Sequence, residues 1–317
     1  MSDQSYETIY NRVLDVTAVI HVPLKIFTVL IMIRHTPPEM KYLSYLLLDG
    51  MLWNLVANII FIFIHLTPMF PAECLRADGI IRYFANNEFL YHALFLAVFY
   101  CIMNCGIAMA SAFYYRYIIF AFPQRASKIK LSCIVVYHVI VHLGVLPPFC
   151  FVYIQWIEPY SAYPLRDELP PPSGLFCFKP FGWGKNLTVL LFLLAIAFLL
   201  ISALISAVLL LRSIEKKKTV MHQSLLDRHR KIIWTFLAIM SVPIVFGAIP
   251  LIVGIVTVLY PSLPYARWIG TVCIVLLANH GALQAILMII AVIPYREGAL
   301  GIIRRMFCCR RNRVDPR

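Results

Sequence analysis

The chain has 317 residues, of which 61% are apolar and only 14% are charged. An average soluble domain is about 45–50% apolar and roughly 25% charged, so this composition excludes an ordinary soluble fold and indicates a membrane protein. The net charge of +13 does not indicate nucleic-acid binding, because the basic residues occupy short segments between apolar runs.

Seven segments are apolar enough and long enough to cross a membrane as helices. About 20 helical residues span the roughly 30 Å hydrocarbon layer, and uniformly apolar runs exclude the alternating strands of a barrel. The predicted spans are residues 10–33, 42–66, 88–114, 131–154, 187–211, 232–259 and 267–293. We therefore predict an all-α bundle of seven membrane-spanning helices, forming a single domain over residues 1–317.

Spans one and two each carry a charged residue deep within an apolar run, namely Lys25 and Asp49. Lys25 and Asp49 lie roughly 13 and 10 Å from the same end of their helices, at 1.5 Å per residue. Charged groups are costly in lipid and usually face the bundle interior. We predict an ion pair between Lys25 and Asp49. The alternative is that Lys25 extends to the membrane surface while Asp49 contacts Asn279 or water.

Three more polar residues, Asn104, Asn279 and His280, lie near the middle of spans three and seven. We expect them to link these two spans by hydrogen bonds, and a ligand-binding role remains open. Pro243 and Pro250 interrupt span six, where proline removes a backbone donor and kinks a helix. Such a kink predicts a hinge, although prolines are also common in membrane helices without that role.

The lysines and arginines predict the orientation. Of the 28, the loops after spans one, three and five and the C-terminal tail hold 20, whereas the opposite side holds 7. Because cytoplasmic loops are enriched in these residues, we predict that the N-terminus lies outside and that residues 297–317 form a cytoplasmic tail.

The predicted outer loops contain two of the nine cysteines, Cys74 and Cys177. Because the outside is oxidising, we predict a disulfide between them; the alternative is two free thiols. Asn186 begins an N-glycosylation sequence on the same side. It lies so close to the membrane that we expect it to be unmodified.

The tail contains a short stretch with the spacing of an amphipathic helix. Its apolar residues share one helical face, and Arg304 and Arg305 can meet anionic lipid, which predicts a short helix lying in the membrane surface. These apolar residues are Ala299, Leu300, Ile302, Ile303 and Phe307. Cys308 and Cys309 follow beside the membrane, where S-palmitoylation is expected. The alternative is a solvated basic tail.

A cationic surface on the predicted inner side can contact a partner's carboxylates or anionic lipid. Arg116 is the most specific member, because it lies near the end of span three in an aromatic setting. The candidate residues are Arg116, Tyr117, Lys216, Lys217, Lys218, Arg228, Arg230, Lys231 and Arg296. The alternative is that these charges only set the topology.

A ligand pocket is expected in the outer half of the bundle. Residues of spans three and seven share faces at helical spacing, and an aromatic cavity with few polar groups suits a small volatile or lipid-like compound. The candidates are His92, Phe95, Phe99, Trp268, Thr271 and Val275. The alternative is ordinary helix packing.

His138 and His142 share a face of span four and are the strongest candidates for an intramembrane enzyme's metal site. Zinc would need a third ligand and a nearby acid, and spans three to seven contain no Asp or Glu except Glu88 at the very start of span three. We therefore predict no metal, no cofactor and no enzymatic activity. A retinal receptor would need a lysine on span seven, and residues 267–293 contain none. A ligand-gated channel or transporter remains the alternative function.

Two motifs resemble the nematode serpentine chemoreceptors. The stretch "RHTPPEM" contains Thr36, Pro37 and Met40 in a Thr-Pro-x-x-Met pattern, and "PYREG" contains Pro294, Tyr295 and Arg296. The sequence resembles class H of that superfamily, with class I second, over about residues 20–305. It departs from the large rhodopsin-like families, since Tyr115 replaces the acid before Arg116.

The resemblance implies a seven-transmembrane G-protein-coupled receptor of the chemosensory, olfactory type. Such a receptor is expected in the plasma membrane of sensory neurons and their cilia. It would bind a small-molecule ligand and signal to a heterotrimeric G protein. The resemblance implies neither the ligand nor the oligomeric state.

Overall fold

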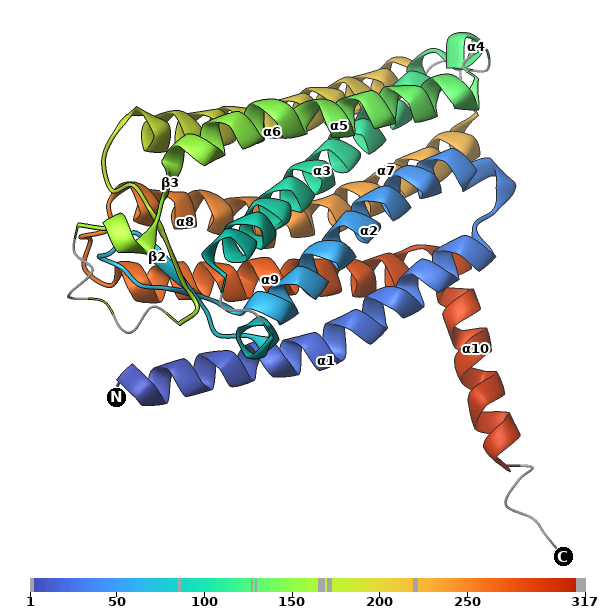
Figure 1. Ribbon diagram of the computed structural model, residues 1–317. Coiled ribbons are helices and arrows are strands. Elements are labelled where there is room, and N and C mark those ends of the chain that lie inside the picture. Colours follow the sequence, from blue (N-terminus) through green and yellow to red (C-terminus); the bar gives the residue numbers. More distant parts are fainter. Residues whose placement is uncertain are drawn as a thin grey trace, which may run out of the picture.

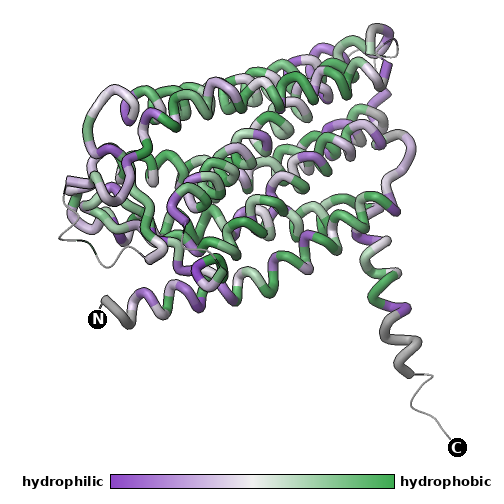
Figure 2. The backbone as a smooth tube through the Cα atoms, viewed as in Figure 1, coloured by the Kyte–Doolittle hydropathy of each residue, from purple (hydrophilic) through white to green (hydrophobic). Residues whose placement is uncertain are grey.

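The computed structural model describes residues 3–84, 87–126, 128, 130–164, 169, 173–218 and 222–311. Within these residues, seven helical segments are long and apolar enough to cross a membrane, and they run side by side (Figure 1). They are α1 (Asp3–His35), α2 (Lys41–Ile64), α3 (Glu88–Ala121), α5 (Leu131–Trp156), α6 (Trp183–Lys216), α7 (Gln223–Pro243) with α8 (Ile249–Leu259), and α9 (Ala266–Ala291). The predicted all-α seven-helix bundle is confirmed. Figure 2 shows that apolar residues predominate along these helices.

The two ends of the bundle differ (Figure 1). The end near the N-terminus carries a small antiparallel sheet in the order β1-β2-β4-β3, and we call it the sheet end. At the other end, α10 (Ile293–Arg311) follows α9 and leaves the bundle, and we call it the α10 end. The strands are β1 (Leu66–Pro68), β2 (Cys74–Ala77), β3 (Ile157–Glu158) and β4 (Leu175–Phe178). Strands this short give no usable alternation, so hydropathy did not predict them.

Short helical turns fill several connections. They are η1 (Pro38–Met40), η2 (Ile80–Tyr83), α4 (Pro123–Ala126) and η3 (Tyr160–Ala162). Asn87 caps the start of α3, because its side-chain oxygen accepts from the backbone N–H groups of Phe89 and Leu90 at 3.0 and 3.4 Å. Such a cap satisfies donors that the first helical turn leaves without partners.

The sixth span is not one continuous α-helix. Pro243 ends α7, a π-helical turn (η5) covers Ile244–Ala248, and Pro250 lies in the first turn of α8. Proline has no N–H group to donate, and π-turns inside α-helices are often functional. The irregular backbone therefore lies between the two prolines that the sequence indicated.

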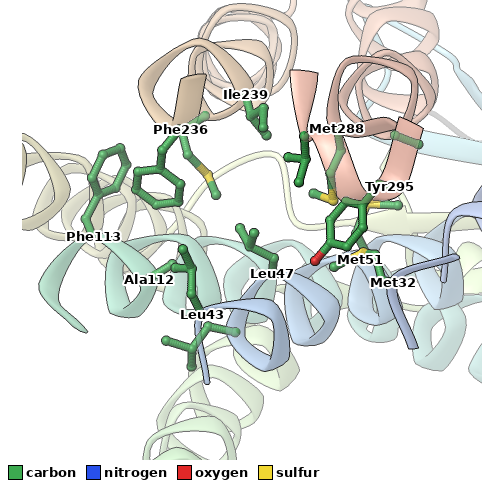
Figure 3. Packing of buried hydrophobic residues seen from close by; sticks show 14 of the residues in the cluster. Met32, Leu43, Leu47, Met51, Ala112, Phe113, Phe236, Ile239, Met288 and Tyr295 are labelled. Atoms are coloured by element: carbon green, nitrogen blue, oxygen red, sulfur yellow. The ribbon is translucent and has the colours of Figure 1, made fainter. Parts of the chain in front are cut away.

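The largest cluster of buried apolar residues lies toward the α10 end, and Figure 3 shows its packing. The helices meet there through van der Waals contact, which drives helix association in membranes. Methionine fills irregular gaps between them. The labelled members are Met32, Leu43, Leu47, Met51, Ala112, Phe113, Phe236, Ile239, Met288 and Tyr295. The cluster joins α1, α2, α3, α6, α7, α9 and α10.

One side of α10 packs against α1, and part of its apolar surface stays exposed. Ala299 is buried in the main cluster, and a Cβ atom at Gly298 would lie 2.5 Å from the His35 ring. Leu300 and Ile303 are exposed apolar residues. The side chains of Phe307, Cys308 and Cys309 lie outside the described part of the chain.

Candidate functional site

The sheet end is tied together by a disulfide. Cys74 of β2 and Cys177 of β4 lie opposite each other in the sheet and are bonded. The bond links the segment after α2 to the segment after α5, across 103 residues of sequence. Asn186 lies exposed in the first turn of α6, whereas Thr188 of the same glycosylation sequence is buried and donates to the Val152 carbonyl at 3.0 Å.

Charged residues dock the start of α1 against this end. The Glu7 carboxylate accepts from Arg76 at 2.6 Å and from Arg267 at 2.5 Å. Behind the disulfide, Glu73 forms a buried ion pair with Lys185. Burial raises the pKa of Glu73 to about 7, although the Lys185 ammonium acts in the opposite direction. The Glu7 contacts thus dock α1 at the sheet end, whereas for Glu73 the cost of burial outweighs the attraction to Lys185.

A cavity of about 140 Å³ lies beneath the sheet, between α3, α8 and α9. Its lining is almost wholly apolar. The aromatic residues in that lining are Phe61, Phe70, Phe95, Phe99, Trp156 and Phe178. In another protein, an apolar cavity of roughly 150 Å³ stays dry and binds benzene. This cavity, which we call the sheet-end cavity, has room for one small apolar molecule.

A second cavity of about 110 Å³, which we call the central cavity, adjoins the first. The two share a wall, which consists of Phe61, Ile102, Leu251 and Leu277. Polar side chains face the central cavity from α2 and α9, namely Asn54, Asn58, His280 and Gln284. The two cavities thus offer an apolar chamber beside a partly polar one.

A chain of hydrogen bonds lies along the polar side of the central cavity. The fully buried Lys25 ammonium donates to the side-chain oxygen of Asn54. Asn54 Nδ2 lies 2.9 Å from His280 Nε2, and His280 Nδ1 lies 2.6 Å from the Leu277 carbonyl oxygen. Nδ1 therefore carries the proton, and Nε2 accepts from Asn54. A Cβ atom at Gly281 would lie 1.8 Å from Asn54 Oδ1, so α9 approaches only because this residue lacks a side chain.

The ion pair predicted between Lys25 and Asp49 is wrong. Lys25 contacts Asn54, whereas Asp49 Oδ2 lies 2.9 Å from His142 Nε2 of α5. Residues 49 and 54 are five apart, which turns the helix by about 140°. The helical rise gave comparable depths, but depth does not fix the direction in which a side chain points.

The predicted link between spans three and seven also has other partners. Asn104 contacts His142 Nδ1 and donates to the Tyr100 carbonyl at 2.9 Å, so it joins α3 to α5. Asn279 donates to Val275 of its own helix at 2.7 Å. His280 joins α9 to α2 through Asn54. Asn104 and His280 thus each contact a helix other than the predicted one, whereas Asn279 bonds within α9.

Two of the six predicted pocket residues, Phe95 and Phe99, line the sheet-end cavity. His92 is buried in packing, with its ring 5.0 Å from Phe176 and its Nδ1 3.2 Å from the Tyr153 hydroxyl. The prediction for span three was therefore correct for Phe95 and Phe99. His92 instead packs against β4 of the sheet.

The three predicted pocket residues of span seven face α1 instead. Trp268 packs against Tyr6 with the two rings tilted and their centroids 3.9 Å apart. Thr271 is buried and donates to the Arg267 carbonyl at 2.9 Å, and Val275 packs beside α1. The residues of α9 that line the sheet-end cavity are Gly270, Cys273, Ile274 and Leu277. The N-terminal part of α1 covers the face of α9 that carries Trp268, Thr271 and Val275.

The candidate cations at the α10 end have different surroundings. Helix α3 continues to Ala121, so half-buried Arg116 lies a turn before its end. Lys217 donates to the Phe120 carbonyl at 2.5 Å and thereby joins α6 to α3. Lys218 pairs with Glu215 at 2.9 Å.

Other members of that set are more open. Lys216, Lys231 and Arg296 are exposed. Arg230 lies 3.7 Å from Glu215, and Tyr117 packs against the apolar residues at the ends of α3, α6 and α7. The side chain of Arg228 lies outside the described residues. The exposed cations remain available to a partner or to lipid.

The two sequence motifs meet at the α10 end. The Tyr295 hydroxyl lies 3.0 Å from Thr36 Oγ1 and 2.7 Å from Ser44 Oγ. The Pro37 carbonyl accepts from the Met40 N–H at 3.0 Å, which forms the turn into α2. Pro294 lies in the first turn of α10. The sequence analysis missed Ser44, as it missed Asn54, although each is a polar residue within an apolar run.

The bundle of seven spanning helices, with cavities between them and a helix after the last, defines a seven-transmembrane receptor. Residues 5–305 match the family of serpentine-type seven-transmembrane G-protein-coupled chemoreceptors called Srh. Because this match covers nearly the whole chain, the chain belongs to the Srh chemoreceptors, the nematode class H. The predicted resemblance is confirmed. No curated protein matches the chain.

Proposed function

We propose that this chemoreceptor binds a small apolar molecule in the sheet-end cavity and signals to a heterotrimeric G protein at the α10 end. The observation that carries the ligand part is the cavity itself, because an apolar lining of aromatic side chains is typical of sites for apolar ligands. Its volume of about 140 Å³ suits a molecule with the size of a single aromatic ring.

Two observations support an orientation with the sheet end outside the cell. The Cys74–Cys177 disulfide lies at the sheet end, and disulfides persist in oxidising compartments. The lysines and arginines concentrate toward the other end, as cytoplasmic segments require. In this orientation the exposed Leu300 and Ile303 of α10 meet the inner leaflet, beside the proposed palmitoylation sites at Cys308 and Cys309. The receptor would act in the plasma membrane, including sensory cilia.

The wall shared by the two cavities offers a route from ligand to G protein. Leu251 of α8 faces both cavities, and α8 follows the π-turn directly. A Cβ atom at Gly247 within that turn would lie 3.5 Å from the His280 ring. A ligand that moves α8 would therefore act on the π-turn between Pro243 and Pro250. This turn is the proposed hinge, and α7 beyond it leads to the α10 end.

The ligand site is tested by filling the cavity. Val258→Phe places a ring in the sheet-end cavity, whereas Val256→Phe makes the same change at an exposed position of α8. Cells that express either variant with promiscuous G-protein subunits are screened with small aromatic and aliphatic odorants. We expect Val258→Phe to weaken the response at least tenfold at equal surface level and Val256→Phe to leave it intact. Equal responses from the two variants would refute the site.

Signalling is tested at Arg116, with Arg212 as a matched exposed cation on α6. We expect Arg116→Ala to abolish the G-protein response without changing ligand affinity or surface level, and Arg212→Ala to retain it. A ligand-gated current that persists without any G protein would instead establish a channel.

A further inference from the structure

Three side chains that can ligate a metal meet between α2 and α5, away from both cavities. Asp49, His138 and His142 each offer one ligand atom, and these atoms all lie within 4.8 Å of one another. Zinc binds nitrogen and oxygen ligands at about 2.0–2.2 Å, so two ligands of one ion lie roughly 3–4 Å apart. The side chains thus need only small rotations to share an ion.

The orientation of His142 is fixed by the residue behind it. Asn104 Nδ2 donates to the Tyr100 carbonyl at 2.9 Å, so Asn104 Oδ1 is the atom that contacts His142 Nδ1. An amide oxygen only accepts, and His142 Nδ1 must therefore carry a proton. Metal-ligating histidines are held in this way, with the second ring nitrogen donating to a neighbouring oxygen.

This tautomer aims the lone pair of His142 Nε2 at Asp49. The neutral ring has no proton on Nε2, yet Asp49 Oδ2 lies only 2.9 Å away. Two lone pairs at this distance repel each other, so a positive centre must lie between them. A proton can bridge only the two atoms Nε2 and Oδ2. A metal ion at the same place can bind both atoms and a third ligand as well.

His138 supplies that third ligand. It precedes His142 by one helical turn, and their ring centroids lie 5.7 Å apart. Its buried Nδ1 has no hydrogen-bond partner among the described residues. The sequence argument against a metal looked for an acid on spans three to seven, but Asp49 comes from span two.

We propose that Asp49, His138 and His142 form a site for a divalent transition-metal ion of the zinc type, which fastens α5 to α2. Two imidazoles and one carboxylate suit zinc, copper and nickel better than magnesium or calcium. The Asp49 side chain is 30% exposed, so the ion would lie near the surface of the bundle. Among the seven candidate spans of the described chain, α5 is the least buried, with only 11% of its most apolar stretch buried. A bound ion would therefore stabilise the attachment of α5, the spanning helix with the least buried surface.

The site is tested on the purified full-length chain in detergent, isolated through an epitope tag without histidine. Thermal unfolding and bound metal are measured during a ZnCl₂ titration, with MgCl₂ as the control for a hard cation. We expect Zn²⁺, but not Mg²⁺, to raise the Tm with saturation at one ion per chain. His138→Ala should weaken this effect at least tenfold, and His138→Cys should restore most of it.

A second variant separates the site from surface binding. His222→Ala removes an exposed histidine at the start of α7 and should leave the Zn²⁺ effect unchanged. His138→Ala keeps the Asp49–His142–Asn104 contacts, so it should fold, and unfolding in the absence of metal checks this. The proposal is overturned if wild type and His138→Ala respond alike, or if wild type binds no Zn²⁺ at saturable stoichiometry. None of these measurements needs a receptor ligand.

Discussion

The side-chain hydroxyls of Thr36 and Tyr295 lie 3.0 Å apart, although 259 positions separate the two residues in the sequence. Tyr295 is fully buried, and its hydroxyl also lies 2.7 Å from Ser44. The two family motifs are therefore one structural unit, which joins the turn between α1 and α2 to the start of α10.

Removing this hydroxyl should destabilise the α10 end. We expect Tyr295→Phe to lower the free energy of unfolding by about 1–2 kcal/mol, because each buried hydrogen bond contributes about 0.5–1.5 kcal/mol. Tyr45→Phe, at an exposed position of α2, is the matched control and should have little effect. Denaturant unfolding of the purified variants measures both. Equal free energies of unfolding for the two variants would show that the Tyr295 hydroxyl does not stabilise the fold.

Adding one methyl group at Gly281 should be more damaging. The new Cβ atom would lie 1.8 Å from Asn54 Oδ1 and 2.7 Å from Lys25 Nζ, so the buried hydrogen bonds must separate. We expect Gly281→Ala to lower the free energy of unfolding by about 2–4 kcal/mol, from overpacking and unsatisfied polar groups. Gly144→Ala, where nothing lies within 4 Å, should be neutral or slightly stabilising.

A double variant checks the cause of that loss. Asn54→Ala removes the atom that Gly281→Ala would meet, so the combined loss should be smaller than the sum of the single losses. Strict additivity would mean that the clash with Asn54 does not explain the effect.

The sheet end should lose stability as the pH rises toward neutrality. The pKa of Glu73 is raised from 4.5 to about 7, so the folded state holds the proton more tightly than the unfolded state between these values. Its contribution is fully present below about pH 4.5 and is lost as the pH rises through 7. We expect the Tm of wild type to fall over this window, and Glu73→Gln to flatten that fall. Glu297→Gln, an exposed change on α10, should keep the wild-type slope.

Breaking the disulfide should loosen the sheet. The bond closes a loop of about 100 residues, and removing a native disulfide typically costs about 2–5 kcal/mol. We expect Cys74→Ser/Cys177→Ser to lower the Tm in non-reducing buffer and to make it insensitive to a reducing agent. Wild type should fall to the same Tm once reduced. A wild-type Tm that reduction leaves unchanged would argue against this role.

The seven spans were predictable because lipid imposes one requirement on every crossing segment, namely about 20 apolar residues in a helix. The strands were not, since two to four residues carry no period. The Cys74–Cys177 disulfide was predictable from its compartment alone, without the strands that bring the two cysteines together. The hydrogen-bond partners of the polar residues inside the bundle were the hardest feature to predict. Lys25 and Asp49 have comparable depths, yet each turns to a different helix, and hydropathy contains no information on rotation about the helix axis.

The same limit applied to the pocket. Phe95 and Phe99 line the sheet-end cavity, but Trp268 and Thr271 do not, because the N-terminal part of α1 packs on their face of α9. A periodic pattern identifies a face that can be buried. It does not identify which neighbour buries it.

The π-helical turn in span six determines which way α8 faces. Such a turn holds one more residue than an α-helical turn, which shifts everything beyond it by about 100° around the axis. Leu251 and Val258 thus owe their inward direction to a single additional residue upstream. Deleting one residue from Ile244–Ala248 would leave the sequence of α8 unchanged. It would nevertheless turn Leu251 and Val258 away from the cavities that they line.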